Sequence, residues 1–308
     1  MRFFHRFTSM NYRFTGLVNG ILLNVSKKRK YTSAIDYLSR YAYAVDNDLL
    51  VQVSEDYKNI IWQCWFQGAD NMPEIVKTCT DSVKKYHGKD IIFLDNSNIM
   101  KYVDLPEYII QKHKNGIIKE SAFSDICRMY LLYKYGGTWV DATIFLTGEI
   151  PKDILESDFF TFRSRESCFL KHINNIEQFK MYSNNFNKII SFESPYFIHA
   201  KPGNPIIKGL LNLFLEYWKH ENTVKDYLMI DKFFVLTLLS DKKLKNDFIE
   251  MPVYYLENVL LLLHVLFEQY DELLYENIVS MSNLHKLTHK NLHRNPYKNS
   301  FLKKLFVG

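Results

Sequence analysis

Short apolar runs alternate with helically spaced apolar positions along most of the chain, starting near residue 59. Runs of this length suit buried strands, and the segments between them suit amphipathic helices. We expect strands at residues 59–65, 90–94, 138–143, 159–162 and 196–200. We expect helices after Pro73 and after Pro106, and at residues 120–135, 205–219, 225–240 and 254–275. This alternation predicts an α/β fold with a mostly parallel sheet and helices on both faces.

The chain has the composition and length of a single globular domain. Its 308 residues are enough to bury a sizeable core, and its 47% hydrophobic and 24% charged content excludes wholesale disorder. It has no internal repeat and no low-complexity linker. We expect a helical arm at residues 1–50, a core at residues 51–200, and a mainly helical part at residues 201–308 that completes the same domain.

The N-terminal arm combines positive charge with an apolar stripe. Seven of the 39 Lys and Arg residues lie in residues 1–35, where no acid precedes Asp36. A stripe at helical spacing is formed by Phe14, Leu17, Val18, Ile21, Leu22 and Val25. A spanning helix needs roughly 20 apolar residues, so we expect instead an interfacial helix on anionic headgroups. A helix docked on the protein's own core and a mitochondrial presequence stay open as alternatives.

The remaining charge and the cysteines bear on partners and compartment. Outside the arm, basic and acidic residues nearly balance, which argues against a nucleic-acid-binding body. The chain has four cysteines, which are scattered and include no CxxC pair: Cys64, Cys79, Cys127 and Cys168. We expect buried free thiols in a reducing compartment. Because the first apolar stretch is broken by Asn19 and lacks a small-residue cleavage site, no cleavable signal peptide is expected. These features predict a cytoplasmic protein that is peripheral at the inner face of the cell membrane.

One predicted helix has a polar face, although the rest of its surface is apolar. On the helix at residues 120–135, Ser121, Asp125 and Arg128 are spaced i, i+4 and i+7 and share one face. A carboxylate and a guanidinium on a buried helix are costly unless they pair with each other or with a ligand. The spacing leaves both an internal ion pair and a ligand site open.

A carboxylate follows at the end of the next predicted strand. The helix stops at Gly136-Gly137, where glycine permits close backbone approach, and the strand then runs into Asp141. Ligands of open α/β sheets bind beyond the carboxyl ends of strands, which makes Asp141 a candidate site residue. The alternative is a turn residue.

These segments carry a family resemblance. The sequence FSDICRMYLLYKYGGTWVDAT at residues 123–143 is similar to the core of bacterial capsular polysaccharide synthesis glycosyltransferases. These are related to the glycosyltransferases whose sugar-binding region contains a DXD motif (glycosyltransferase family 32-like). Residues 60–68 (IIWQCWFQG) resemble the family's first strand, and residues 106–108 resemble an intervening segment. With weaker echoes at residues 200–205 and 226–227, the resemblance covers about residues 58–240.

The resemblance implies a fold, a reaction and its substrates. It implies a GT-A fold, in which a Rossmann-like sheet binds a nucleotide-sugar. The donor would be a UDP- or GDP-sugar, and related enzymes retain the anomeric configuration. It implies hexose transfer to a saccharide acceptor in capsular or cell-surface polysaccharide synthesis. A lipid-linked acceptor would give the basic arm a purpose.

The resemblance also implies roles for individual residues. Trp62 would stack on the donor base, with a core tryptophan as the alternative. Asp125 would hold sugar hydroxyls, and Arg128 would lie near the sugar and diphosphate, where its planar donors suit oxygen acceptors. Asp141 would be the first Asp of the DXD element. Further substrate-binding candidates are Ser121, Gly137 and Thr143.

The motif departs from the wider DXD pattern at its third position. The chain has Asp-Ala-Thr, so Thr143 stands where a second Asp is usual. A hydroxyl is a poorer ligand than a carboxylate for the Mn²⁺ or Mg²⁺ that bridges a diphosphate. Either Asp141 binds the metal with help from His285 or His289, or Arg128 and lysines neutralise the diphosphate. Surface histidines without this role are a further possibility.

Two other classes of function stay open on the sequence. The missing second Asp is compatible with a non-catalytic protein that binds a nucleotide-sugar or scaffolds a capsule-assembly complex. A toxin-like glycosyltransferase that modifies protein is the other alternative.

Overall fold

The computed structural model describes residues 32–56, 58–88, 91–185, 195–226, 229–290 and 297–307. The apolar stripe predicted for the arm therefore lies outside the described residues. Where the arm is described, it packs on the body of the protein. The 3-10 helix η1 (Ser39–Asp46) follows a helical turn at residues 32–38 and contacts α7 (Pro205–His220). The Asn212 amide joins the two by donating to the carbonyl oxygens of Val45 (3.2 Å) and Asn47 (2.8 Å).

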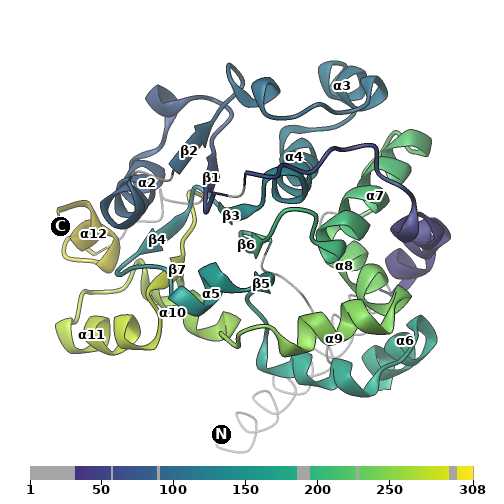
Figure 1. The fold of residues 1–308 in the computed structure, drawn as a ribbon. Coiled ribbons are helices and arrows are strands. Elements are labelled where there is room, and N and C mark those ends of the chain that lie inside the picture. The colour runs from purple at the N-terminus through teal and green to yellow at the C-terminus, as the bar shows by residue number, and fades with distance from the viewer. Residues whose placement is uncertain are drawn as a thin grey trace, which may run out of the picture.

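A five-stranded sheet forms the centre of the molecule (Figure 1). In spatial order its strands are β2 (Ile91–Leu94), β1 (Ile61–Cys64), β3 (Gly137–Val140), β6 (Phe197–Ala200) and β5 (Phe159–Thr161). β1 pairs in parallel with both β2 and β3, whereas β6 is antiparallel to both of its neighbours. Four of the five strands therefore point the same way, and only β6 is reversed.

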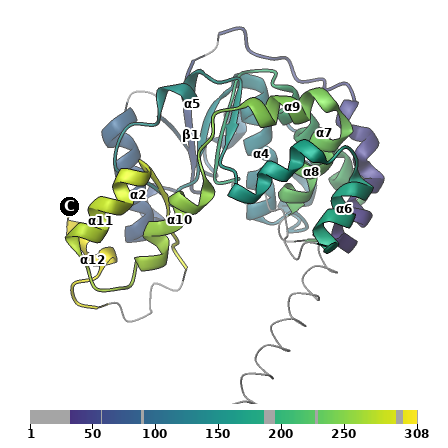
Figure 2. The same ribbon diagram turned by 90° about the horizontal axis from the view of Figure 1, so that it is seen from below.

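Helices cover both faces of this sheet, as Figure 2 shows from below. One layer contains α3 (Glu107–Lys114), α4 (Glu120–Tyr135), α6 (Ile176–Asn185), α7, α8 (Met229–Ser240) and α9 (Lys242–Glu250). The other contains α2 (Glu74–His87), α5 (Lys152–Glu156), α10 (Leu256–Val265), α11 (Glu272–Met281) and α12 (Phe301–Val307). The predicted α/β architecture, with a mostly parallel sheet and helices on both faces, is confirmed.

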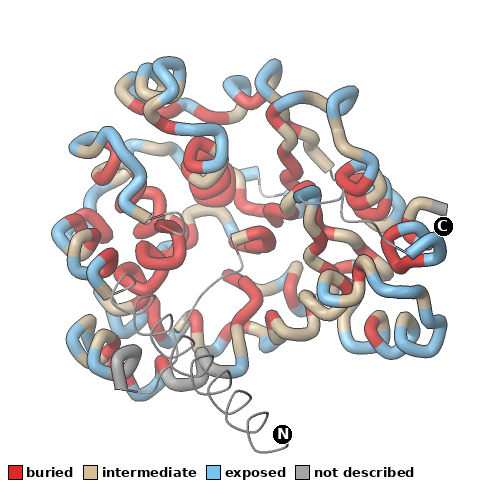
Figure 3. The backbone as a smooth tube through the Cα atoms, turned by 180° about the vertical axis from the view of Figure 1, so that it is seen from behind, coloured by how far each residue is buried: buried red, intermediate tan, exposed pale blue. Residues whose placement is uncertain are grey.

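Alternation along the strands explains why the core divides in two. Trp62 and Trp139 point into the layer of α4 and α7, and their neighbours Ile61 and Val140 point into the layer of α2 and α10. In Figure 3 the buried residues accordingly follow the strands and the sides of the helices that face the sheet. Cys64, Cys79 and Cys127 are buried free thiols, as predicted for them.

The turn between α4 and β3 needs its two glycines. Gly136 has a φ of 68°, and its N–H donates to the carbonyl oxygen of Leu132, which ends the helix. Gly137 has a φ of 94°, and a Cβ there would lie 2.3 Å from the carbonyl oxygen of Ile60. A side chain at Gly137 would therefore disrupt the pairing of β3 with β1.

The structure differs from the sequence predictions after β3. The strand ends at Val140, and the chain then enters β4 (Ile144–Leu146), which pairs antiparallel with β7 (Leu284–Lys286). Neither of these strands was predicted. The single helix expected at residues 254–275 is wrong, because α10 and α11 are separate helices. Within the described part of the chain, no helix has the length and apolar character that a membrane span requires.

Candidate active site

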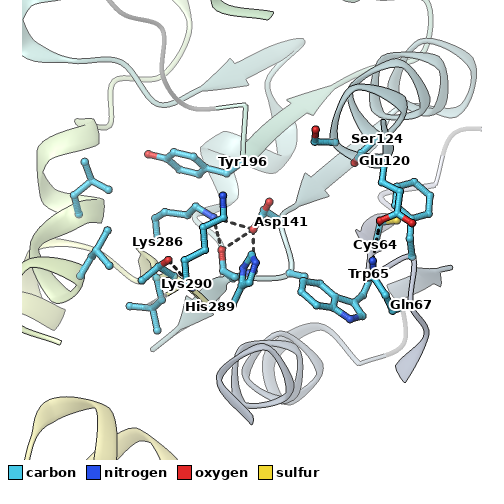
Figure 4. Close-up of a pocket in the computed structure, with 18 of the residues that line it drawn as sticks. Cys64, Trp65, Gln67, Glu120, Ser124, Asp141, Tyr196, Lys286, His289 and Lys290 are labelled. Atoms are coloured by element: carbon cyan, nitrogen blue, oxygen red, sulfur yellow. Dashed lines mark hydrogen bonds and ion pairs between the residues drawn. The ribbon is translucent and has the colours of Figure 1, made fainter. Parts of the chain in front are cut away.

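Asp141 lies directly after the carboxyl end of β3, where it was predicted. Its backbone N–H donates to the carbonyl oxygen of Tyr196 (2.8 Å), just before β6, and its own carbonyl accepts from the N–H of Ile144 (2.9 Å), the first residue of β4. The residue is thus held between two strands. Figure 4 shows its side chain directed into a cleft, with Lys286 and His289 nearby.

The Asp141 carboxylate is the centre of a polar cluster with Thr143 and Lys286. Its Oδ1 accepts from the Thr143 N–H (2.9 Å), the Thr143 hydroxyl (2.6 Å) and the Lys286 ammonium (2.9 Å). Lys286 also donates to the Thr143 hydroxyl oxygen. Burial raises the pKa of Asp141, but the Lys286 charge and the Thr143 hydrogen bonds outweigh it and hold that pKa well below its usual range.

Asp125 and Arg128 form a second acid–base pair on α4. Asp125 Oδ1 lies 3.3 Å from an Arg128 guanidinium nitrogen, and the Arg128 side chain is only 7% exposed. The same guanidinium donates to the Pro195 carbonyl oxygen (2.6 Å) and lies over the Trp139 ring, 4.7 Å from its centroid. Burial raises the pKa of Asp125 to about 6, with Arg128 opposing the shift and Asp141 adding to it. The ion pair left open by the sequence is therefore present.

Both pairs border one cleft with two lobes. The first, which we call the Arg128 lobe, has a volume of about 900 Å³ and includes Asp125, Arg128 and Asp226 in its lining. The second, which we call the Trp65 lobe, has a volume of about 660 Å³ and includes Trp65, Thr143 and His289. Five residues line both lobes: Ser121, Ser124, Asp141, Tyr196 and Lys286. The lobes therefore meet at Asp141, and the polar helix face also borders a ligand-sized space.

The Trp65 lobe has aromatic and apolar walls. The Trp65 and His289 rings meet edge to face with centroids 5.3 Å apart. Opposite them, α10 contributes Leu256, Leu260 and Leu263. Burial and the neighbouring charge of Lys290 lower the pKa of His289, although Asp141 opposes the shift. Such a lobe suits a flat, partly apolar ligand group.

His285 is not placed to help Asp141 bind a metal. Successive side chains of β7 point to opposite sides, so Lys286 faces Asp141 while His285 turns into the protein. His285 is fully buried, and its Nε2 lies 3.1 Å from the Thr147 hydroxyl. Burial lowers its pKa to about 4.

The groups around Asp141 do not fit a divalent cation. Mg²⁺ and Mn²⁺ prefer hard oxygen ligands, and Mg²⁺ is usually held by one or two carboxylates together with substrate phosphates. Here the surroundings are one carboxylate, one hydroxyl and an ammonium bound to the same oxygen, Oδ1. No cluster of three His, Cys, Asp or Glu residues able to hold a metal occurs among the described residues.

Two predicted substrate-binding residues lie outside both lobes. Trp62 is 1% exposed, donates its indole N–H to the Gly136 carbonyl oxygen (2.8 Å), and packs against Tyr102 and Tyr135. This position fits the core-tryptophan alternative and not a role at the donor base. Gly137 lies at the amino end of β3, the opposite end from Asp141, and its role there is the tight turn.

Trp65, Tyr196 and Lys286 are among the cleft residues that the sequence interpretation missed. Trp65 and Tyr196 both lie in segments that were recognised, but each was taken only as part of a strand region. Lys286 lies within the sequence HKLTHK at residues 285–290, where the histidines drew attention instead. One signal could have identified Lys286. It is a lysine in a segment considered for the metal site, and the second carboxylate expected at that site is missing.

Comparison with known proteins gives the chain a family. A family model described as capsular polysaccharide synthesis protein matches residues 24–305. The chain is 26% identical over 196 residues to "O-glycosyltransferase braB" of Annulohypoxylon truncatum, covering 54% of this chain and 39% of that protein, so it spans well under half of the relative's length. A solved structure, "PaToxG Glycosyltransferase", matches with a TM-score of 0.39 and 17% identity over 71% of this chain and 83% of that one, a likeness too low to carry an argument. Since the family model covers most of its length, the chain belongs to the capsular polysaccharide synthesis protein family.

Proposed function

We propose that the chain is a glycosyltransferase that moves a hexose from a UDP- or GDP-sugar to a saccharide acceptor in capsular or cell-surface polysaccharide synthesis. One observation carries the proposal. Asp125 and Arg128 on α4, Asp141 after β3 and Lys286 on β7 all border a single cleft at the carboxyl end of β3. Family membership and the curated glycosyltransferase relative support the same reaction class.

The two lobes suggest how a donor would lie. We place the base in the Trp65 lobe, where Trp65 and His289 offer ring faces and edges, and not against the buried Trp62. The diphosphate would then lie at the junction of the lobes, within reach of Lys286 and Arg128. The hexose would enter the Arg128 lobe, where Asp125 would accept hydrogen bonds from its hydroxyls.

The transfer itself exchanges one bond at the anomeric carbon for another. The bond from that carbon to the phosphate oxygen breaks, and its electron pair leaves with the nucleoside diphosphate. The acceptor hydroxyl oxygen forms the new glycosidic bond and gives its proton to the departing phosphate oxygen. Attack and departure on the same face would retain the configuration. Arg128 would stabilise the negative charge that develops on the diphosphate.

For the acceptor, we propose a lipid-linked saccharide at the inner face of the cell membrane. Seven basic residues and no acid in residues 1–35 would favour contact with anionic headgroups. The protein would then be cytoplasmic and peripheral to the membrane. Deleting residues 1–30 should release it from vesicles that contain anionic lipid, and unchanged cosedimentation would contradict this part of the proposal.

A thermal-shift screen against UDP-, GDP- and CDP-sugars tests the function directly. A ligand present at 100 times its Kd stabilises the native state by about 2.7 kcal/mol, which is readily measured. We expect one class of nucleotide-sugar to raise the Tm and then to release nucleoside diphosphate on incubation. Binding without any turnover would favour the non-catalytic alternative, motivated by Thr143 in the third motif position. The absence of binding to every donor would contradict the donor site.

A further inference from the structure

Lys286 contacts both oxygen-bearing side chains of the Asp-Ala-Thr element. Its ammonium lies 2.9 Å from Asp141 Oδ1 and also donates to the Thr143 hydroxyl, so it contacts the first and third positions of the Asp-Ala-Thr element together. A divalent ion bound through Asp141 Oδ1 and the Thr143 hydroxyl would have to compete with this ammonium for the same two oxygens.

The backbone around Lys286 holds the ammonium in this position. β7 pairs with β4 in a fixed register, with Lys286 opposite Ile144. The buried His285 beside it fixes which face of the strand turns toward Asp141. The Lys286 side chain is 21% exposed, and its ammonium lies 5.5 Å from the centroid of the Tyr196 ring. Figure 4 shows this side chain reaching Asp141.

We propose that the Lys286 ammonium takes the place of the divalent cation at the leaving diphosphate, so that donor binding and sugar transfer proceed without a metal. This inference rests on the proposed glycosyltransferase function. Asp141 and Thr143 serve as acceptors that orient the ammonium and are not metal ligands.

The chemistry of an ammonium suits this task. Lysine has three N–H donors, and Asp141 and Thr143 accept two of them, so a third can bind a ligand. A phosphate oxygen is a strong acceptor for such a charge-assisted bond. The group transfers no proton, because the electron pair of the breaking bond stays on the phosphate oxygen, which takes its proton from the acceptor hydroxyl. Lys286 contributes charge and hydrogen bonding only.

Nucleotide binding by the full chain provides the first test. Titrations with UDP and with GDP should give Kd values that agree within about twofold in EDTA and in Mn²⁺, since no metal takes part. Lys286→Gln, which replaces the ammonium with a neutral amide on a side chain one atom shorter, should weaken binding about 10- to 100-fold. Lys84→Gln, an exposed lysine on α2, is the matched control and should bind as the wild type does. A Mn²⁺-dependent gain of tenfold or more in the wild type would overturn the inference.

Transfer or donor hydrolysis provides the second test. The wild type should be equally active in EDTA and Mn²⁺, and Lys286→Gln should lose about 10²- to 10³-fold, the usual cost of removing one preorganised donor. The double variant Thr143→Asp with Lys286→Ala rebuilds two carboxylates without the ammonium. We expect it to require Mn²⁺ both for UDP or GDP binding and for turnover. Its metal-dependent binding shows that the folded site remains, even where turnover is low.

The outcomes separate this inference from the proposed function. A wild type that binds a donor and turns it over only with Mn²⁺ overturns the role of Lys286 but leaves the glycosyltransferase assignment standing. Undiminished nucleotide binding by Lys286→Gln has the same consequence. A wild type that binds neither nucleotide nor nucleotide-sugar overturns the donor site itself, and the inference with it.

Discussion

The cleft contains two acid–base pairs that behave in opposite ways. Asp125 and Arg128 belong to one helix and lie 3.3 Å apart, whereas Asp141 and Lys286 lie 2.9 Å apart and are separated by 145 residues along the chain. The pKa of Asp125 is raised to about 6, while that of Asp141 is held well below its usual range. Proximity of a cation alone does not set the protonation of a carboxylate.

The difference comes from what else each partner contacts. For Asp125, burial is the largest influence on the pKa, the nearby charge of Asp141 adds to it, and the charge of Arg128 only partly offsets the two. Asp141 receives two hydrogen bonds from Thr143 besides the ammonium of Lys286. A carboxylate is kept ionised by the number of donors that converge on it. In the proposed reaction, the two carboxylates would therefore have separate roles: Asp125 would face the neutral sugar, whereas Asp141 would orient Lys286 at the charged diphosphate.

The largest effect should follow from breaking the second pair. Asp141→Asn should reduce transfer about 10²- to 10³-fold, because Lys286 loses the charge that orients it at the diphosphate. Release of nucleoside diphosphate from the donor measures this effect, with circular dichroism to verify the fold. Asp81→Asn, at an exposed acid on α2, is the control. Near-normal turnover by Asp141→Asn would remove Asp141 from the site.

Breaking the first pair should cost both activity and stability. Arg128→Ala leaves Asp125 without its cation and should lower the free energy of unfolding by about 3 kcal/mol, measured by urea denaturation. Arg128→Lys should recover much of that stability, yet it should remain nearly as inactive as the alanine variant because it lacks the planar donor array. A lysine variant with near-normal transfer would make Arg128 a structural cation.

The pH dependence of stability should distinguish the two acids by sign. The raised pKa of Asp125 means that the folded state keeps a proton which the unfolded state loses near pH 4. Its contribution is therefore present below pH 4 and disappears as the pH rises to about 6, a change of about 2–3 kcal/mol. The lowered pKa of Asp141 gives the reverse: stability present above about pH 4 and lost on acidification.

Unfolding free energies measured at several pH values for Asp125→Asn and Asp141→Asn test this contrast. Asp125 should give the plot of unfolding free energy against pH a negative contribution to its slope between pH 4 and 6, and Asp125→Asn should lack that contribution. Asp141→Asn should lose a positive slope below pH 4. The slope is the readout, since each substitution also shifts stability by a constant amount. Slopes of equal sign would show that the two pairs do not differ as described.

The smallest effect should come from Trp62 within β1 and Trp65 directly after it. Trp62→Phe removes the hydrogen bond to Gly136 and should cost about 1 kcal/mol of stability, with no change in nucleotide affinity. Trp65→Ala should instead weaken UDP or GDP binding about tenfold through loss of ring contact. Thermal unfolding and titration calorimetry of both variants provide the measurements. Weakened nucleotide binding by Trp62→Phe alone would reverse the assignment.

The sequence predicted one side of the cleft better than the other for a physical reason. α4 and the start of β3 are local: sixteen residues of continuous helix and a Gly136-Gly137 stop are visible in any short window. β7 has three residues, and its partner β4 lies about 140 positions earlier, so no short window contains the pairing. Lys286 is positioned by that pairing, and its role could not be predicted from its neighbours.

A similar reason explains the helix that was wrongly joined. No Gly or Pro separates α10 from α11, so the usual breaker signal is missing. The break is instead encoded by Asp271, whose side chain accepts from the Leu274 N–H (2.7 Å) and caps α11. An aspartate that caps the start of a helix is a weaker sequence signal of a helix boundary than a glycine that ends one.

The reversed strand β6 changes which residues lie at the carboxyl end of β3, where the cleft is. In a fully parallel sheet all strands end on the same side, so that side contains only residues that follow a strand. Here the entry into β6 lies at the same edge, so Pro195 and Tyr196 lend their carbonyl oxygens to Arg128 and to the Asp141 N–H. The Arg128 side chain and the Asp141 backbone are thus anchored by main-chain carbonyl oxygens. The orientation of a single strand therefore makes these two contacts independent of which side chains residues 195 and 196 carry.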